Sequence, residues 1–324
     1  MNYEIIEGDA LTRLREFPKE FINCIVTSPP YWGLRDYGME GQLGREATPE
    51  EYVSKLVEIF REAHRVLRKD GTLWLNLGDS YASGGKGGKG GGGSFMKERR
   101  DGSWKPRAEA KGCRKAPLGL KHKDLVGIPW MVAFALRTDG WYLRSEIIWH
   151  KSNCLPESVV DRPTKAHEHI FLMSKSPKYF YDADAIREPH SEDSLRPTKR
   201  KFVYRHAVSG QTPHTLTPDG FCHPKGKNKR DVWRVSTKAF KGAHFATFPT
   251  KLIEPCVLAG CPPGGTVLDP FMGSGTTAIV ALQYGRNFKG IELNPAYIEI
   301  AKNRIFMNEV ENENQPCLWN DANQ

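Results

Sequence analysis

The sequence predicts an α/β protein built on a mostly parallel sheet with helices on both faces. Short apolar runs, bounded by Gly, Pro or Asp, alternate with helical patterns along most of the 324 residues. These runs are apolar throughout, as expected of strands that are buried on both faces. A hydrophobic content of 39% is sufficient for a substantial core. The length allows one large domain or two modest ones.

The N-terminal half begins with strands and one long helix. The first three expected strands are apolar runs at residues 3–6, 21–26 and 73–77. The segment TPEEYVSKLVEIFREAHRVLRKDG predicts a helix between the second and third of these strands. Thr48 can cap it, Pro49 suits its first turn and Glu51 completes a capping box. Its apolar residues recur at helical spacing, and Gly71 is expected to end it.

The same alternation continues to the C-terminal part of the chain. Further helices are expected at residues 126–136, 276–284 and 295–307. Further strands are expected at residues 146–149, 170–173, 266–268 and 288–291.

Two stretches interrupt this alternation, and both are strongly basic. Residues 83–124 contain the tract GGKGGKGGGGS and carry 12 Lys and Arg against 4 Asp and Glu, so we expect a mobile basic loop. Residues 187–241 carry 13 basic against 5 acidic residues, with aromatic residues between them. Since the whole chain has a net charge of +9, its basicity is local. This pattern favours nucleic-acid contact over the alternative of a solvated surface.

A glycine turn in the segment TVLDPFMGSGTTAIVAL joins an expected strand to an expected helix. Such a turn brings backbone N–H groups and a helix N-terminus close to a ligand. The Lys of a phosphate-binding loop and the third glycine of a dinucleotide fingerprint are both missing. Asp269 ends the strand before the turn, and Glu292 ends the strand after it. This acidic crevice suits a cationic nucleoside cofactor, and S-adenosylmethionine fits that description; a plain tight turn is the alternative.

A rigid corner follows the second expected strand, in the sequence TSPPYW. Pro29 and Pro30 lack N–H groups and have a fixed φ, so their carbonyls are expected to point outward as hydrogen-bond acceptors. Tyr31 supplies a flat face on which a base could stack. Taken alone, the corner favours a simple turn that ends a strand over a base-binding site.

The segments TSPPYW, LDPFMGSGTT and IELNP together resemble the amino-methylating DNA methyltransferases. The catalytic motif precedes the cofactor motif and a basic segment separates them, which resembles the circularly permuted beta group of that family. The resemblance implies a Rossmann-like, S-adenosylmethionine-dependent methyltransferase fold with a seven-stranded, mostly parallel sheet. It also implies methyl transfer to the exocyclic amino group of a base flipped out of double-stranded DNA.

The resemblance assigns roles to individual residues. The target base would be held by Ser28, Pro29, Pro30 and Tyr31. The cofactor would be bound by Asp9, Ala10, Phe245, Phe248, Pro249, Thr250, Asp269, Phe271, Gly273, Gly275, Thr276 and Glu292. Serine before Pro-Pro-Tyr is associated with the cytosine amino group, so we favour cytosine-N4 and keep adenine-N6 as the alternative. Methylation of RNA or of a protein glutamine is a more distant alternative, as is a non-catalytic nucleic-acid-binding protein.

The resemblance also divides the chain. We expect residues 1–186 to form the catalytic part of the methyltransferase domain, residues 187–241 the target-recognition region and residues 242–324 the cofactor-binding part. A homodimer is compatible with the family, and the sequence does not decide it. With no apparent signal peptide or membrane-spanning segment, we expect a soluble cytoplasmic protein.

Four further features bear on possible sites. Seven scattered cysteines without a CxxC pair support neither a zinc site nor a disulfide framework, so we expect no metal. Cys256 follows a proline, as a cytosine-C5 nucleophile would, but its apolar helical surroundings favour a core position. His167 and His169 are expected on one face of a strand without a third ligand. Asp79 could face the cofactor crevice or cap the following segment.

Overall fold

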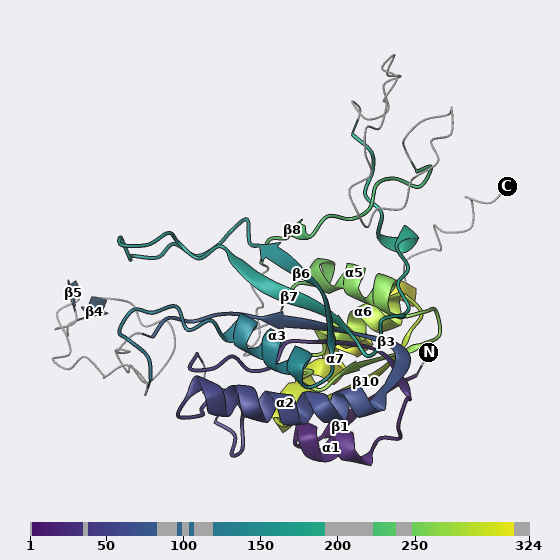
Figure 1. Ribbon diagram of the computed structural model, residues 1–324, viewed down its shortest axis with the longest axis horizontal. Coiled ribbons are helices and arrows are strands. Elements are labelled where there is room, and N and C mark those ends of the chain that lie inside the picture. The colour runs from purple at the N-terminus through teal and green to yellow at the C-terminus, as the bar shows by residue number, and fades with distance from the viewer. Residues whose placement is uncertain are drawn as a thin grey trace.

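The computed structural model describes residues 2–34, 38–82, 96–98, 104–106, 119–191, 223–237 and 248–313. Within these residues, one eight-stranded sheet lies between two layers of helices (Figure 1). Its strands are β1 (Tyr3–Glu7), β2 (Ile22–Thr27), β3 (Leu67–Leu77), β6 (Tyr142–His150), β7 (His167–Ser174), β8 (Val232–Arg234), β9 (Thr266–Asp269) and β10 (Asn287–Glu292). The helices are α1 (Ala10–Glu16), α2 (Pro49–Val66), α3 (Ile128–Thr138), α5 (Thr250–Gly260), α6 (Thr276–Gln283) and α7 (Pro295–Glu313). The α/β class is therefore confirmed.

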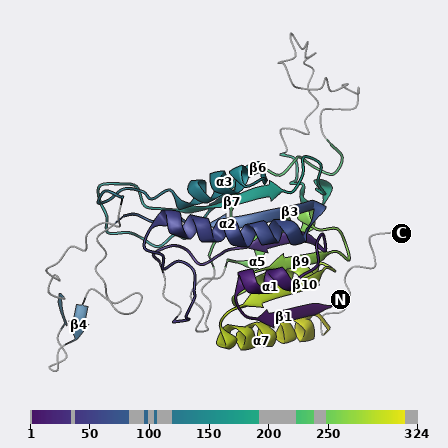
Figure 2. The same cartoon turned by 60° about the horizontal axis from the view of Figure 1, so that its bottom comes forward.

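The strand order is β1-β10-β9-β2-β3-β7-β6-β8. Figure 2 shows this order from β1 near the bottom, through β10, β9, β3 and β7, to β6 near the top. All neighbouring strands are parallel except β7, which is antiparallel to both β3 and β6. A separate antiparallel pair consists of β4 (Met96–Glu98) and β5 (Trp104–Pro106), within the expected basic loop. Most of that loop lies outside the described residues.

The sheet has one strand more than the seven expected. The additional strand is β8, which lies in the segment predicted to recognise the target and pairs in parallel with β6. Trp233 of β8 is buried and stands in register with Trp149, whereas Val232 and Arg234 beside it are exposed. Only three residues long and set among charged residues, β8 gives too short an apolar pattern to be predicted.

Each face of the sheet has its own apolar core. Leu73, Leu75 and Leu77 of β3 face the layer of α1, α2 and α3, where α2 contributes Leu56, Phe60 and other buried residues. Trp74 points to the opposite face, into the layer formed by α5, α6 and α7. Successive residues of a strand alternate between the two faces of a sheet, and both faces are covered here. That is why the expected strands are apolar throughout.

The long helix α2 begins as predicted but ends earlier. The Glu51 amide donates to Thr48 Oγ1 at 3.2 Å, and a Glu51 carboxylate oxygen accepts from the Ala47 amide at 3.1 Å. The prediction that Gly71 ends the helix is wrong, because the helix stops at Val66 and Gly71 lies within β3. A side chain at Gly71 would place its Cβ 2.9 Å from the Asn23 carbonyl oxygen. The glycine therefore allows a close approach of two backbones instead of a helix end.

The parallel strands bring the sequence motifs to one edge of the sheet. The carboxyl ends of β1, β2, β3, β9 and β10 lie at the same edge, since these strands run in one direction. Asp9 follows β1, Ser28 follows β2, and Asp269 and Glu292 end β9 and β10. Ligands of open α/β sheets bind at this edge. None of the helices in the described part of the chain is long and apolar enough to cross a membrane.

Candidate functional site

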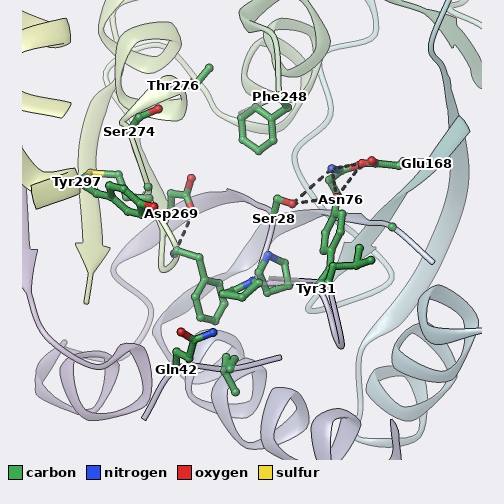
Figure 3. Close-up of a pocket in the computed structure, with 18 of the residues that line it drawn as sticks. Ser28, Tyr31, Gln42, Asn76, Glu168, Phe248, Asp269, Ser274, Thr276 and Tyr297 are labelled. Carbon is green, nitrogen blue, oxygen red and sulfur yellow. Dashed lines mark hydrogen bonds between the residues drawn. The ribbon is translucent and has the colours of Figure 1, made fainter. Parts of the chain in front are cut away.

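A cavity of about 900 Å³ lies along the carboxyl edge of the sheet. Its size falls within the range of small-molecule sites. One part is lined by three carboxylates, those of Asp9, Asp269 and Glu292. Another part is lined by Glu168 together with Lys151 and Lys165, the two lysines among the described lining residues. Figure 3 shows Asp269, Ser274 and Thr276 on one side of the cavity and Tyr31, Asn76 and Glu168 on the other, with Phe248 above Ser28.

The structure brings most of the predicted site residues together. Those that line the cavity are Asp9, Ala10, Ser28, Pro29, Pro30, Tyr31, Phe248, Asp269, Phe271, Gly273, Thr276 and Glu292. Pro249, Thr250 and Gly275 are described but are not among its lining residues. Pro249 and Thr250 start α5 next to Phe248, and Gly275 is the residue before α6. Phe245 lies outside the described residues.

The glycine turn is held in place by contacts with α7. Gly273 and Gly275 have φ values of 55° and 78°, a left-handed conformation that favours glycine. A Cβ atom on Gly275 would lie 3.0 Å from the Ala301 side chain, so this glycine also allows α7 to pack closely. Arg304 of α7 donates to the Ser274 carbonyl at 2.6 Å and to Thr276 Oγ1 at 3.1 Å. The turn is thus a fixed part of the cavity wall.

Asp269 joins three segments beneath the cavity. The Thr27 hydroxyl and the Phe271 amide donate to its Oδ1 at 2.6 and 3.0 Å, and the Thr277 hydroxyl donates to Oδ2 at 2.6 Å. Despite these bonds, burial raises the pKa of Asp269 to about 6. A carboxylate accepts about four hydrogen bonds, so one acceptor position on Oδ2 remains for a ligand. A cation beside Asp269 would relieve the cost of burying its charge.

Glu292 and Asp9 are also oriented by the backbone. The Gly273 amide donates to Glu292 Oε2 and the Asn294 amide to Oε1, both at 2.8 Å. Burial raises the pKa of Glu292, although these amides favour its charged form. Asp9 caps α1, where its Oδ1 accepts from the amide and the hydroxyl of Thr12, each at 2.9 Å. The three carboxylates give this part of the cavity an affinity for cationic and hydroxyl-bearing groups.

The corner after β2 differs in one detail from the expectation. The Pro30 carbonyl does not point outward, because it accepts a hydrogen bond of 2.8 Å from the Tyr52 hydroxyl of α2. Within the described part of the chain, the Pro29 carbonyl accepts no hydrogen bond. Ser28 and Pro29 therefore supply the acceptors of this corner, and the Tyr52 contact fixes its position. The corner therefore both ends β2 and supplies hydrogen-bond acceptors.

A polar network behind the corner was missed by the sequence reasoning. The Tyr31 hydroxyl donates to Glu168 Oε2 at 2.7 Å. The buried Asn76 amide group donates to the Tyr31 oxygen at 2.8 Å, to Glu168 Oε2 at 3.0 Å and to Ser28 Oγ at 3.4 Å. Lys151 donates to the other Glu168 oxygen. The Asn76 Oδ1 atom has no partner among the described residues, a rare state for a buried polar atom and one typical of functional sites.

The position of Glu168 could have indicated this network. His167 and His169 have ring centroids 5.1 Å apart, as expected for alternate residues of β7. His169 Nδ1 lies 2.6 Å from Glu146 Oε1, whereas Glu168 between the two histidines reaches the Tyr31 hydroxyl. No cluster of metal-binding side chains occurs among the described residues. The useful signal was thus the carboxylate between the histidines, at the start of a strand.

The structure also resolves the alternatives for Cys256 and Asp79. Cys256 is fully buried in α5 outside the lining of the cavity, and burial raises the pKa of its thiol well above the ordinary value. The core position is confirmed, and a nucleophilic role has no support. Asp79 does both of the things considered: it lines the cavity, and its Oδ1 accepts from the Ser80 amide of the following segment at 2.8 Å. Its carboxylate also accepts from the amides of Gly127 and Ile128 at the start of α3, which was not predicted.

Gly78 makes room for the Tyr31 ring, and we expect Gly78→Ala to displace it. The added Cβ would lie 2.5 Å from a Tyr31 ring carbon, closer than any relaxed contact. Overpacking of this kind typically costs about 1–3 kcal/mol. Thermal denaturation should show a modest loss of stability, and the activity proposed below should fall more than ligand affinity at the Asp269 end. A fully active Gly78→Ala variant would contradict this placement of Tyr31.

Comparisons with known proteins agree with this geometry. Residues 22–303 match a family model described as DNA methylase, N6_N4_Mtase. The chain is 49% identical to the type II methyltransferase M.Cfr9I of Citrobacter freundii, over 93% of this chain and 87% of that protein. It is 46% identical to the type II methyltransferase M.SmaI of Serratia marcescens, over 93% and 90%.

Solved structures share the fold. PvuII DNA methyltransferase, described as cytosine-N4-specific, is similar with a TM-score of 0.60 at 20% identity, over 94% of this chain and 86% of that one. A putative DNA modification methylase of Thermus thermophilus, complexed with S-adenosyl-L-methionine, is similar with a TM-score of 0.56 at 24% identity, over 95% and 96%. At these identities the likeness shows the fold alone.

Proposed function

The chain belongs to the N6/N4 DNA methylase family, and from this premise we propose that it is a site-specific DNA methyltransferase. It transfers a methyl group from S-adenosylmethionine to the exocyclic amino group of a base flipped out of double-stranded DNA. The observation that carries the proposal is the single cavity that joins the acidic glycine-turn end to the Ser28–Tyr31 corner. One end is suited to a cationic cofactor and the other to an amino group.

The cavity fits the cofactor. S-adenosylmethionine supplies an electrophilic methyl group on a positively charged sulfur. Asp269 would attract the cationic methionine part, and Glu292 would accept hydrogen bonds from ribose hydroxyls, since backbone amides already orient its carboxylate. Phe271 and Tyr297 supply flat faces to the lining of the same cavity. The Thermus thermophilus relative, whose structure contains this cofactor, supports the assignment.

The corner of Ser28 and Pro29 would hold the target amino group. The lone pair of the amino nitrogen is delocalised into the base, so this nitrogen is a poor nucleophile. Two N–H bonds directed at Ser28 Oγ and the Pro29 carbonyl would favour a tetrahedral nitrogen whose lone pair points at the methyl group. The gain comes from positioning and electrostatics, without a covalent enzyme intermediate. Proximity of the Tyr31 ring would fix the plane of the base.

The DNA surface is proposed to include the basic segment around β8. Part of its charge is engaged within the protein, since Arg187 and Lys225 pair with Asp184 and Lys229 pairs with Glu188. The pairing of β8 with β6 holds the described part of the segment at the edge of the sheet. Sequence recognition is therefore proposed for the remaining residues of the segment 187–241. The division at residues 186 and 241, a cytoplasmic location and a homodimer stay predictions.

Cytosine-N4 is the favoured target, with adenine-N6 as the alternative. Serine stands before Pro-Pro-Tyr here, and the PvuII enzyme with a similar fold is described as cytosine-N4-specific. The names of M.Cfr9I and M.SmaI support a role as the modification enzyme of a type II system. RNA or protein methylation is less consistent with these relatives.

Radiolabelled methyl transfer tests the proposal. The full chain and labelled S-adenosylmethionine are incubated with unmodified genomic DNA, with RNA and with protein, and the DNA is then digested to nucleosides. We expect label in DNA, as N4-methylcytosine. Label only in RNA or protein would overturn the proposal. N6-methyladenine as the sole product would overturn the choice of base and leave DNA methylation standing.

A further inference from the structure

A hydrogen-bonded chain runs from Glu168 through Tyr31 to Ser28 (Figure 3). Its two oxygen-to-oxygen distances are 2.7 Å, from the Tyr31 hydroxyl to Glu168 Oε2, and 3.2 Å, from Ser28 Oγ to the Tyr31 oxygen. The two motif residues come from the corner after β2, and Glu168 comes from β7, 137 positions from Tyr31. No catalytic step described above uses Glu168. Its function is therefore open.

The direction of every bond in this chain is fixed by its Glu168 end. An ionised carboxylate only accepts hydrogen bonds, so Tyr31 must use its single proton on Glu168. The Tyr31 oxygen then acts as an acceptor, and it receives the Asn76 amide at 2.8 Å. Ser28 must consequently donate its proton to Tyr31. This leaves the lone pairs of Ser28 Oγ, one of them facing a long 3.4 Å contact with Asn76, to accept from other groups.

Lys151 keeps the Glu168 carboxylate, at one end of the hydrogen-bonded chain, ionised. Burial alone would raise the pKa of Glu168, but the Lys151 ammonium and the bonds from Lys151, Tyr31 and Asn76 together hold it below its ordinary value. Burial and the negative charge of Glu168 raise the pKa of Tyr31, so its hydroxyl stays protonated at neutral pH. Both protonation states that the chain requires are thus favoured by their surroundings.

We propose that Glu168 is a positioning residue that sets the polarity of the Ser28 hydroxyl. Through Tyr31 it makes Ser28 present an oxygen lone pair, and not a hydrogen, to the target amino group. A serine hydroxyl can do either, and an N–H group needs an acceptor. The inference rests on the proposed function, because it gives the amino-group acceptor of that same site its direction. It holds equally for cytosine and adenine, whose amino groups both donate.

Glu168→Gln is a sensitive test because Lys151 determines the orientation of the introduced side-chain amide. Lys151 only donates hydrogen bonds, so the Gln carbonyl would face Lys151 and its NH2 group would face Tyr31. Tyr31 would then donate to Ser28, and Ser28 would direct its hydrogen toward the target amino group. Two donors would face each other where a donor and an acceptor are needed. Asn76, which donates to the same Glu168 oxygen, would lose that acceptor as well, so the substitution changes the polarity of the whole network with little change of shape.

The experiment is a double-substitution cycle of Glu168→Gln and Tyr31→Phe, with single-turnover methyl transfer to DNA as the readout. We expect Glu168→Gln alone to lower the rate about 10-fold to 100-fold while S-adenosylmethionine affinity stays within about twofold. Tyr31→Phe keeps the ring but interrupts the chain, so it should cause a similar loss. Once Tyr31 is Phe, adding Glu168→Gln should cost less than about threefold, because the remaining path from Glu168 to Ser28 is the long 3.4 Å contact of Asn76 with Ser28.

Glu146→Gln is the matched control. Glu146 is a β6 carboxylate that contacts His169 instead of the cavity, so this variant should keep the wild-type rate. The inference is overturned if Glu168→Gln costs less than threefold, or if it costs threefold or more when Tyr31 is already Phe. If the Glu168→Gln variant does not fold, the Tyr31→Phe variant alone tests the inference. A decrease of less than threefold in its methyl-transfer rate would then overturn the inference. An active wild type with unaffected variants removes this inference only, whereas a wild type that does not methylate DNA removes the proposed function and the inference with it.

Discussion

Ser28→Ala is expected to lower the rate of methyl transfer about 100-fold to 1,000-fold, the loss typical of deleting one preorganised polar group at a reacting centre. Ser28 Oγ is the side-chain acceptor at the corner, and the hydrogen-bond chain through Tyr31 holds it in place. Alanine leaves the Pro29 carbonyl as the remaining acceptor of the corner. The amino group would then keep more of its planar, delocalised form.

The loss should appear in the chemical step and not in binding. Ser28 Oγ bonds to Tyr31 and Asn76 and not to the three carboxylates proposed to bind the cofactor, so the affinity for S-adenosylmethionine should change by less than about twofold. Single-turnover rates and equilibrium binding measure the two quantities separately. Ser176→Ala, two residues past the end of β7 and outside the cavity, is the matched control and should be fully active. A Ser28→Ala variant within threefold of the wild-type rate would contradict the role given to this hydroxyl.

The sequence was informative wherever a motif and a strand end coincide. The strand pattern alone predicted that Asp269 and Glu292 would meet across a glycine turn, and the structure joins them through Phe271, Gly273 and the cavity. Parallel strands make such meetings predictable, because their carboxyl ends share one edge. The local pattern is sufficient to place these two carboxylates. Ser28 was expected at the same site only from the family resemblance, and it lines the same cavity.

Asn76 and Glu168 were missed for a physical reason. Their meeting with Tyr31 depends on β7 being inserted antiparallel between β3 and β6, with Asn76 opposite Ile170. Neither the neighbour of a strand nor its register is encoded in its own apolar pattern. β8 was missed because its contribution is one buried residue, Trp233, in a charged segment. Long-range pairing therefore determined those parts of the site that the motifs did not contain.

Asp269→Ala is expected to have the largest effect on both stability and cofactor binding. It removes the acceptor of two buried hydroxyl groups and one backbone amide, those of Thr27, Thr277 and Phe271. Each buried polar group left without a partner costs about 1–3 kcal/mol. The Thr277 hydroxyl keeps a 3.5 Å contact with the Val26 carbonyl, so the free energy of unfolding should fall by about 2 kcal/mol or more. Chemical denaturation measures this loss. An unchanged denaturation midpoint would show that the hydroxyls find other partners.

Asp269→Asn separates the charge of this residue from its hydrogen bonds. An amide can keep the Phe271 contact and exchange bonds with the threonine hydroxyls, so stability should be largely retained. The contribution of Asp269 to the stability of the unliganded wild type should fall as the pH rises from about 4 to about 6. The reason is that the pKa of Asp269 is about 6 when folded, against an ordinary 3.8, so the folded state holds the proton more tightly. The Asn variant should lack this dependence.

Cofactor affinity should show the opposite pH dependence. The cation needs the ionised carboxylate, so wild-type affinity for S-adenosylmethionine should weaken as the pH falls below about 6, approaching tenfold per pH unit. Asp269→Asn should bind weakly at every pH, with a flat profile. Calorimetric titration from pH 5 to 8 measures both, and Asp70→Asn, at an exposed carboxylate outside the cavity, is the matched control. If Asp269→Asn bound the cofactor as tightly as wild type at pH 7.5, the carboxylate would be purely structural and the cation would have to be held by Glu292 or Asp9.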